Sequence, residues 1–175
     1  PDIEAIITAL EARYGRSRHI ARFDPMEELV CCILSQHTAD VNSFPAFTRL
    51  RETFPTWEAV VEAGTERLAD VIRLAGLANQ KSRNIIACLK QIRELAGSYS
   101  LEHLRAQPMR EARQWLMDLP GVGPKTASIV LLFCFGLPLM PVDTHVERVS
   151  RRIGLVPPKA GPDEQHEIYW HLLAP

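Results

Sequence analysis

The sequence predicts an all-α fold, and three observations support this expectation. Apolar residues recur every three or four positions, beginning with the segment 3–10, which is the spacing of one face of a helix. Residues that start or end helices, such as capping hydroxyls, carboxylates and glycines, separate these apolar segments. No stretch of strand length alternates apolar and polar residues, so a sheet is not expected.

The first half of the chain contains several expected helices joined by short connections. After the helix at 3–10, the run Asp24-Pro25-Met26-Glu27 supplies an N-cap, a proline at the first helical position and a capping-box carboxylate. These residues start a helix that includes the apolar segment Leu29–Leu34. Three further helices are expected to begin at N-capping side chains, namely Thr56, Thr65 and Asn79.

Four more helices are expected in the second half of the chain. One covers Met109–Met117, and the next covers Lys125–Phe135 and ends at Gly136. The segment 125–135 is apolar nearly all round, so we expect it to be a central buried helix. Asp143 is expected to cap a helix over Thr144–Ile153, and a last helix covers about Asp163–Leu173.

The charge of the chain does not by itself indicate a nucleic-acid partner. The 175 residues carry 20 basic and 21 acidic side chains, for a net charge of −1. The distribution is uneven, however, because the segment 71–93 contains only basic charges, at Arg73, Lys81, Arg83, Lys90 and Arg93. This basic strip permits a side that faces DNA, and the alternative is a set of solvated helix faces.

The composition favours an intracellular protein. No apolar run is long enough to cross a membrane, and the N-terminus lacks the pattern of a signal peptide. The four cysteines, Cys31, Cys32, Cys88 and Cys134, lack metal-ligand spacing and are expected to be small buried side chains. We therefore expect a reducing compartment, the cytoplasm or nucleoid.

The segment Leu119–Ala127, with the sequence LPGVGPKTA, is the most informative part of the chain. Gly121 and Gly123 flank one apolar residue that can point inward, and Pro124 is suited to open the next helix. The free amides of such a turn can bind a phosphate, whereas the alternative is a helix–helix turn without a ligand. A Walker A loop is excluded because Pro124 separates Gly123 from Lys125 and the preceding segment is helical.

Lys125 and Asp143 are the candidate catalytic residues. Lys125 falls in the first turn of an apolar helix, where the helix dipole and burial would both favour the uncharged, nucleophilic amine. A surface lysine without a catalytic role is the alternative. Asp143 is expected to cap its helix, and a capping carboxylate can also face a cleft.

These motifs resemble the endonuclease III branch of the helix-hairpin-helix-GPD DNA glycosylases. The resemblance rests on Leu119–Ala127 followed by Val142–His145, and it extends to Ile33–Asp40 and Ile72–Ile85. It implies two helical lobes with a DNA cleft between them. A six-helix barrel at 22–135, with the hairpin at 109–135, would form one lobe, and residues 1–21 and 136–175 the other.

The resemblance also implies roles for individual residues. Lys125 matches the catalytic lysine and Asp143 the catalytic aspartate, while Leu77 matches a wedge that fills space in the DNA and His37 stands where many members have glutamine. Further DNA contacts are expected from Gln36, Lys81, Arg83, Gly121, Gly123, Thr126 and His145. The backbone carbonyls of Met117, Leu119 and Val122 match those that hold a structural alkali ion in such hairpins.

The activity implied is base excision on double-stranded DNA by a monomer. The enzyme would flip a damaged base, an oxidised pyrimidine by resemblance, out of the duplex. Lys125 would displace the base and form a Schiff base, and the resulting abasic site would be cleaved by β-elimination. Abasic sites would therefore also be substrates.

Three alternatives remain at this point. A monofunctional glycosylase of the same fold would lack a nucleophilic lysine, a non-catalytic DNA binder would not need Asp143, and a metal-dependent nuclease would need clustered carboxylates. Members of the resembled family usually carry a four-cysteine iron–sulfur cluster in a C-terminal segment. The sequence stops at Pro175, before that segment would begin, and its own cysteines cannot substitute. We expect no cofactor within these residues, and a [4Fe-4S] cluster only in a longer parent chain.

Overall fold

The computed structural model describes residues 2–16 and 21–173, and over these residues it contains α-helices, two short 3₁₀ helices and no strand. This confirms the all-α prediction. The α-helices are α1 (Ile3–Tyr14), α2 (Pro25–Ser35), α3 (Asp40–Thr53), α4 (Trp57–Val71), α5 (Ala78–Ala96), α6 (Met109–Met117), α7 (Pro124–Phe135), α8 (Thr144–Arg152) and α9 (Pro162–Leu173). The 3₁₀ helices are η1 (Arg73–Ala75) and η2 (Glu102–Ala106). Among the described residues, no helix combines the length and apolar character needed to cross a membrane.

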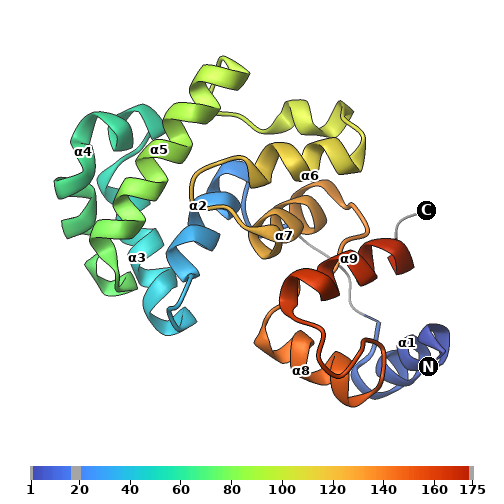
Figure 1. Ribbon diagram of the computed structural model, residues 1–175. Helices are drawn as coiled ribbons and strands as arrows, with labels where there is room; N and C mark the ends of the chain where they lie inside the picture. Colours follow the sequence, from blue (N-terminus) through green and yellow to red (C-terminus); the bar gives the residue numbers. More distant parts are fainter. Residues whose placement is uncertain (1, 17–20, 174–175) are drawn as a thin grey trace.

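The larger hydrophobic core is built by the six helices α2 to α7, with α2 in its middle (Figure 1). Leu29, Ile33 and Leu34 of α2 are fully enclosed, and α2 contacts α3, α5 and α7. The expectation that 125–135 would be the central helix is therefore wrong. Five residues of α7 are buried, whereas Phe133 near its end is 40% exposed, because α7 lies beside α2 rather than inside the bundle.

A second, smaller core lies where α8 and α9 meet the loops around them. It consists of Val142, Val156, Ala160 and Tyr169. The next residue of α9, Trp170, belongs to the larger core instead. Figure 1 shows α8, α9 and α1 grouped together, away from α3, α4 and α5. The division into lobes at 22–135 stays a prediction about how the chain is organised.

The predicted side-chain caps of α2 and α4 are present. Asp24 accepts a hydrogen bond from the Glu27 amide as part of a capping box, and Thr56 accepts one from Ala59. The break in α4 falls at Gly64, which has a non-helical backbone (φ 78°, ψ 170°), one residue before the expected cap.

Two helices differ from the prediction, and neither start carries a side-chain cap. Helix α3, which begins after Ala39 without a capping bond and contains Pro45, was not predicted. Burial of Phe47 and Leu50 in the larger core outweighs the interruption by the proline. The fifth helix starts at Ala78 after Leu77 in the left-handed conformation, so Asn79 lies inside the helix rather than at its cap.

Candidate active site

A cavity of about 520 Å³, named the polar cavity for the charged and amide side chains that line it, opens where four segments meet. Its walls come from the turn after α2 and from the starts of α7, α8 and α9. The lining residues are Ser35–Thr38, Gly123–Thr126, Val142–Thr144, Glu147, Pro162, Asp163 and His166. The cavity therefore brings together six of the predicted site residues: Gln36, His37, Gly123, Lys125, Thr126 and Asp143.

Lys125 is the second residue of α7 and lines this cavity. Pro124 precedes it at the first helical position, as predicted, and Gly123 enters the helix in an extended conformation. The side chain of Lys125 is exposed. The expectation that this side chain is buried is therefore wrong. The position in the first turn of α7 is as predicted.

Asp143 caps α8 and lines the same cavity. Its Oδ1 atom accepts hydrogen bonds from the amides of His145 (2.9 Å) and Val146 (2.7 Å), so the predicted cap is confirmed. Both capping bonds go to Oδ1, which leaves the second carboxylate oxygen, Oδ2, outside the cap. The carboxylate of Asp143 is half-buried. The cap fixes its orientation through Oδ1 and leaves Oδ2 available to a second partner.

The hairpin between α6 and α7 forms the tight turn that Gly121 and Gly123 predicted, with one apolar residue between them pointing inward. Val122 is buried and points inward, and its amide donates to the carbonyl oxygen of Leu119 (3.1 Å). Gly121 has φ 78°, and a Cβ atom there would lie 3.0 Å from the Asn84 side chain on α5. A Cβ on Gly123 would meet nothing within 4 Å. The turn is therefore closely packed at Gly121 and has free space at Gly123.

The side chains of His37 and Leu77 are exposed on two neighbouring turns. Among the described residues, these are the two non-glycine positions with positive φ, 53° at His37 and 46° at Leu77. His37 lines the polar cavity, whereas Leu77 lies outside it and is 56% exposed. A left-handed backbone is uncommon for such side chains and is typical of functional turns.

Lys81 does not face the solvent, so its predicted contact with DNA is wrong. The residue is 3% exposed, and its Nζ atom donates hydrogen bonds to Leu34 O, Thr38 Oγ1 and Ala75 O. Three acceptors satisfy all three ammonium protons, which leaves none for a phosphate.

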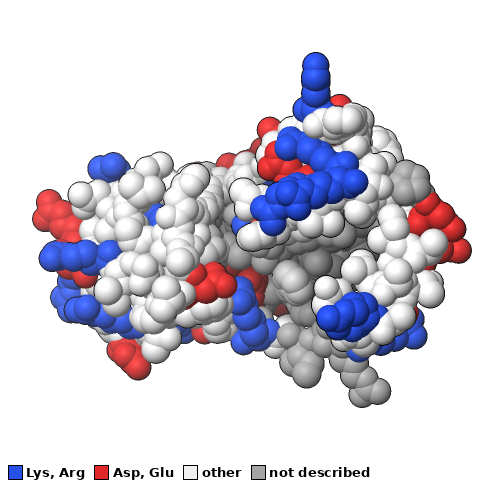
Figure 2. Space-filling model, turned by 90° about the horizontal axis from the view of Figure 1, so that it is seen from below, with Lys and Arg blue, Asp and Glu red and all other residues white. Residues whose placement is uncertain are grey.

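The predicted basic strip is not continuous. Arg73 pairs with Asp70, and Arg93 bonds the Gly97 carbonyl, whereas Arg83 and Lys90 are exposed on α5. On the face seen in Figure 2, basic side chains lie in separate groups on both halves of the molecule, with acidic side chains among them.

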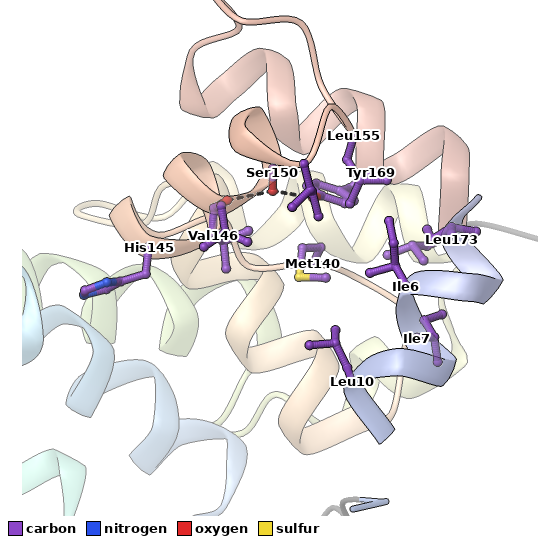
Figure 3. A pocket seen from close by; sticks show the side chains of 13 residues that line it. Ile6, Ile7, Leu10, Met140, His145, Val146, Ser150, Leu155, Tyr169 and Leu173 are labelled. Carbon is purple, nitrogen blue, oxygen red and sulfur yellow. Dashed lines mark hydrogen bonds between the residues drawn. The ribbon is translucent and has the colours of Figure 1, made fainter. Parts of the chain in front are cut away.

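His145 lies away from the polar cavity, in spite of its place in the same motif as Asp143. Its ring is exposed, contacts Arg148 (3.0 Å), and lies at the edge of a second, apolar cavity of about 360 Å³. Figure 3 shows this cavity between α1 and the pair α8 and α9, with side chains such as Ile6 and Leu173 pointing into it. Thr126, another predicted contact, lines the polar cavity but is only 5% exposed.

Three titratable residues of the polar cavity were not predicted as site residues: Glu147, Asp163 and His166. Glu147 lies one turn beyond Asp143, and that spacing on a capped helix was a usable signal. His166 is 5% exposed. Burial lowers its pKa and Arg113 acts in the same direction, against a bond that the ring donates to the Met140 backbone. No local pattern in the sequence indicates that this histidine is buried.

The described residues do not fit an iron–sulfur cluster. Across ranges 2–16 and 21–173, no three His, Cys, Asp or Glu side chains come together as a metal site. Burial raises the pKa of the Cys31 thiol to about 11 and those of Cys88 and Cys134 to about 12, which disfavours the thiolate that ligates iron. The alkali ion at the hairpin carbonyls stays a prediction; the Leu119 carbonyl already accepts the Val122 amide.

A family model described as HhH-GPD superfamily base excision DNA repair protein matches residues 30–175. The chain is 34% identical over 171 residues to endonuclease III of Thermotoga maritima, covering 98% of this chain and 75% of that protein. It is 37% identical over 135 residues to endonuclease III of Escherichia coli, covering 77% of this chain and 60% of the other.

Solved structures of endonuclease III also match this chain. Chains from a non-covalent endonuclease III–DNA complex and from a trapped covalent endonuclease III–DNA intermediate both match with a TM-score of 0.81, at 28% and 29% identity. The match covers 98% and 99% of this chain, and 76% and 77% of those chains. The chain spans about half the length of a relative from Arabidopsis thaliana and 55% of endonuclease III from Rickettsia felis.

Proposed function

Because the chain belongs to the HhH-GPD superfamily of base excision DNA repair proteins, we propose that it is a DNA glycosylase that also cleaves the strand at abasic sites. The observation that carries this proposal is the placement of Lys125 and Asp143 on one polar cavity, at the starts of α7 and α8. An amine and a carboxylate on one cavity are the two groups that a lyase of this kind requires.

The proposed reaction begins with the uncharged amine of Lys125. Its nitrogen lone pair attacks C1′ of the deoxyribose, and the bond from C1′ to the base breaks with its electron pair leaving on the base. The free oxygen of Asp143 faces positive charge that develops on the sugar, or receives a proton from the attacking nitrogen. Ring opening gives a Schiff base, after which a proton leaves C2′ and the 3′ phosphate departs.

The proposed substrate is duplex DNA with a damaged base or an abasic site. A base must leave the stack to reach a cavity at the helix ends, and 520 Å³ is ample space for one nucleoside. Amides of the hairpin at Gly121 and Gly123 would hold the backbone without reading sequence. We propose oxidised pyrimidines as the bases removed, because the motifs Leu119–Ala127 and Val142–His145 resemble those of the endonuclease III branch.

Borohydride trapping tests this proposal. Wild-type protein mixed with a duplex containing one abasic site is expected to form a covalent adduct in EDTA, and K125Q is expected to form none. The exposed lysine of α5 supplies the matched control, K90Q, which should trap like wild type. Adduct formation by K125Q would place the nucleophile elsewhere.

Two further outcomes identify the alternatives. Release of a damaged base by a wild-type protein that forms no adduct would indicate a monofunctional glycosylase. Binding of DNA without base release or strand cleavage would indicate a non-catalytic binder. A panel of duplexes that each carry a single oxidised pyrimidine identifies the preferred lesion.

A further inference from the structure

The ammonium group of Lys81 is a buried charge that the proposed chemistry does not use. Lys81 projects from the first turns of α5, and its Nζ atom lies 2.6 Å from Leu34 O, 2.7 Å from Ala75 O and 2.7 Å from Thr38 Oγ1. Among the described residues, no carboxylate forms an ion pair with it. A buried ammonium therefore depends on neutral oxygens alone.

The positions of these oxygens explain how the charge is tolerated. Leu34 lies in the last turn of α2 and Ala75 is the last residue of η1. Carbonyls at helix C-termini lack intrahelical partners and carry partial negative charge. One ammonium thus caps two helices, and the hydroxyl of Thr38 completes its set of three acceptors.

The same three acceptors belong to the two turns with left-handed residues. Leu34 and Thr38 flank His37, while Ala75 precedes Leu77 by two residues. Thr38 also reaches across directly, because its hydroxyl is within hydrogen-bonding distance of the Ala75 carbonyl. Strained turns persist only where the surroundings fix them, and Lys81 with Thr38 supplies that fixation for both turns at once.

We propose that Lys81 is a positioning residue that locks the turns bearing His37 and Leu77 into one preformed edge that enters the DNA duplex. This inference rests on the proposed function. An apolar side chain and an imidazole held outward beside the cavity can fill the space that a flipped nucleotide vacates. Locking both turns before binding removes the cost of ordering them in the complex.

The test compares duplex and single-stranded substrates. Cleavage of an abasic site in single-stranded DNA needs Lys125 but no insertion into a duplex. K81M is therefore expected to lose at least tenfold in kcat/KM for a damaged base in duplex DNA, and to stay within twofold of wild type for the single-stranded abasic site, per folded molecule. K90M, on the same helix but exposed, should match wild type on both.

Two more variants keep the test decisive if K81M folds poorly. T38V removes the hydroxyl link at nearly unchanged side-chain shape and should show a smaller loss, also confined to the duplex. The variant H37A/L77A removes the two side chains of the edge. Adding K81M to this variant should lower kcat/KM for the damaged base in duplex DNA by less than twofold, because the effects of residues that act as one unit do not add.

The outcomes separate the inference from the function. A wild-type protein that cleaves neither substrate overturns the proposed function itself. Equal losses on both substrates for K81M and T38V, or an undiminished tenfold effect of K81M in the H37A/L77A background, overturn the role of Lys81 and leave the lyase assignment intact.

Discussion

The side-chain amide of Gln36 donates a hydrogen bond of 2.8 Å to the carbonyl oxygen of Gly121. This bond joins the turn after α2 to the hairpin between α6 and α7, across 85 residues of sequence. Gln36 also lines the polar cavity. One side chain thereby holds the hairpin in place and contributes to the wall of the candidate active site.

Replacing Gln36 tests this link. Q36L replaces the amide with a slightly shorter apolar side chain and leaves the Gly121 carbonyl without its donor, so we expect the free energy of unfolding to fall by about 1–3 kcal/mol. Urea denaturation measures the change. Q80L alters an exposed glutamine on α5 and is the control. Equal stability of Q36L and Q80L would show that the bond contributes nothing.

The two hairpin glycines are expected to respond differently to alanine. Gly121 has φ 78°, and a new Cβ would press on Asn84 at 3.0 Å, so G121A should lower the free energy of unfolding by roughly 1–3 kcal/mol. Gly123 is open and has φ −104°. We expect G123A to change stability by less than about 1 kcal/mol. Thermal unfolding measures the stability of both variants. A larger loss of stability in G123A than in G121A would contradict the packing described.

Variants of Asp143 can separate its cap from its proposed chemistry. Asparagine caps helices as well as aspartate does, so D143N should keep most of the stability, whereas D143A should lose about 1 kcal/mol more. Both should lose at least about a hundredfold in base release, because neither carries a carboxylate. Single-turnover kinetics beside urea unfolding gives both quantities. Full activity in D143N would leave Asp143 with a capping role alone.

His166 predicts a stability change with pH. Burial, with Arg113, lowers its pKa, and these effects outweigh Asp163, Glu167 and the bond to the Met140 backbone. The unfolded chain takes up the proton near its ordinary pKa of about 6.5, whereas the folded chain does so only at lower pH. Below about pH 6.5 the unfolded state therefore binds more protons, and this residue makes the free energy of unfolding fall as pH falls.

The variant H166Q isolates this contribution. The loss of stability between about pH 7 and about pH 5.5, measured by urea unfolding, should be smaller in H166Q than in wild type, since glutamine does not titrate in this window. H171Q changes an exposed histidine on the same helix and is the control. An identical slope in wild type and H166Q would show that His166 takes up its proton alike in both states.

The parts of the fold that local chemistry determines could be predicted from the sequence. The helices that begin after Asp24, Thr56 and Asp143 carry their own caps, and the structure has all three caps. The starts of α3 and α5 depend on packing and on a left-handed leucine. Those features come from contacts between distant segments, and no short motif marks them.

The same division holds for the candidate site. Lys125, Asp143, Gln36 and His37 were predicted, and they line one cavity because short motifs carry them. The burial of Lys81 could not be read locally, since one of its acceptors, Leu34, lies 47 residues away. A lysine in a basic segment is indistinguishable by sequence from one that caps two helices.

The two hydrophobic cores meet at α9, where Tyr169 belongs to one and Trp170 to the other. Arg110 and Arg113 of α6 stack on the Trp170 ring at 4.9 and 5.5 Å. Lys125 is carried by the first core and Asp143 by the second. We therefore expect the position of the amine relative to the carboxylate to depend on the packing around Trp170. A screen for inactive variants should recover substitutions at Trp170 that leave every cavity residue unchanged.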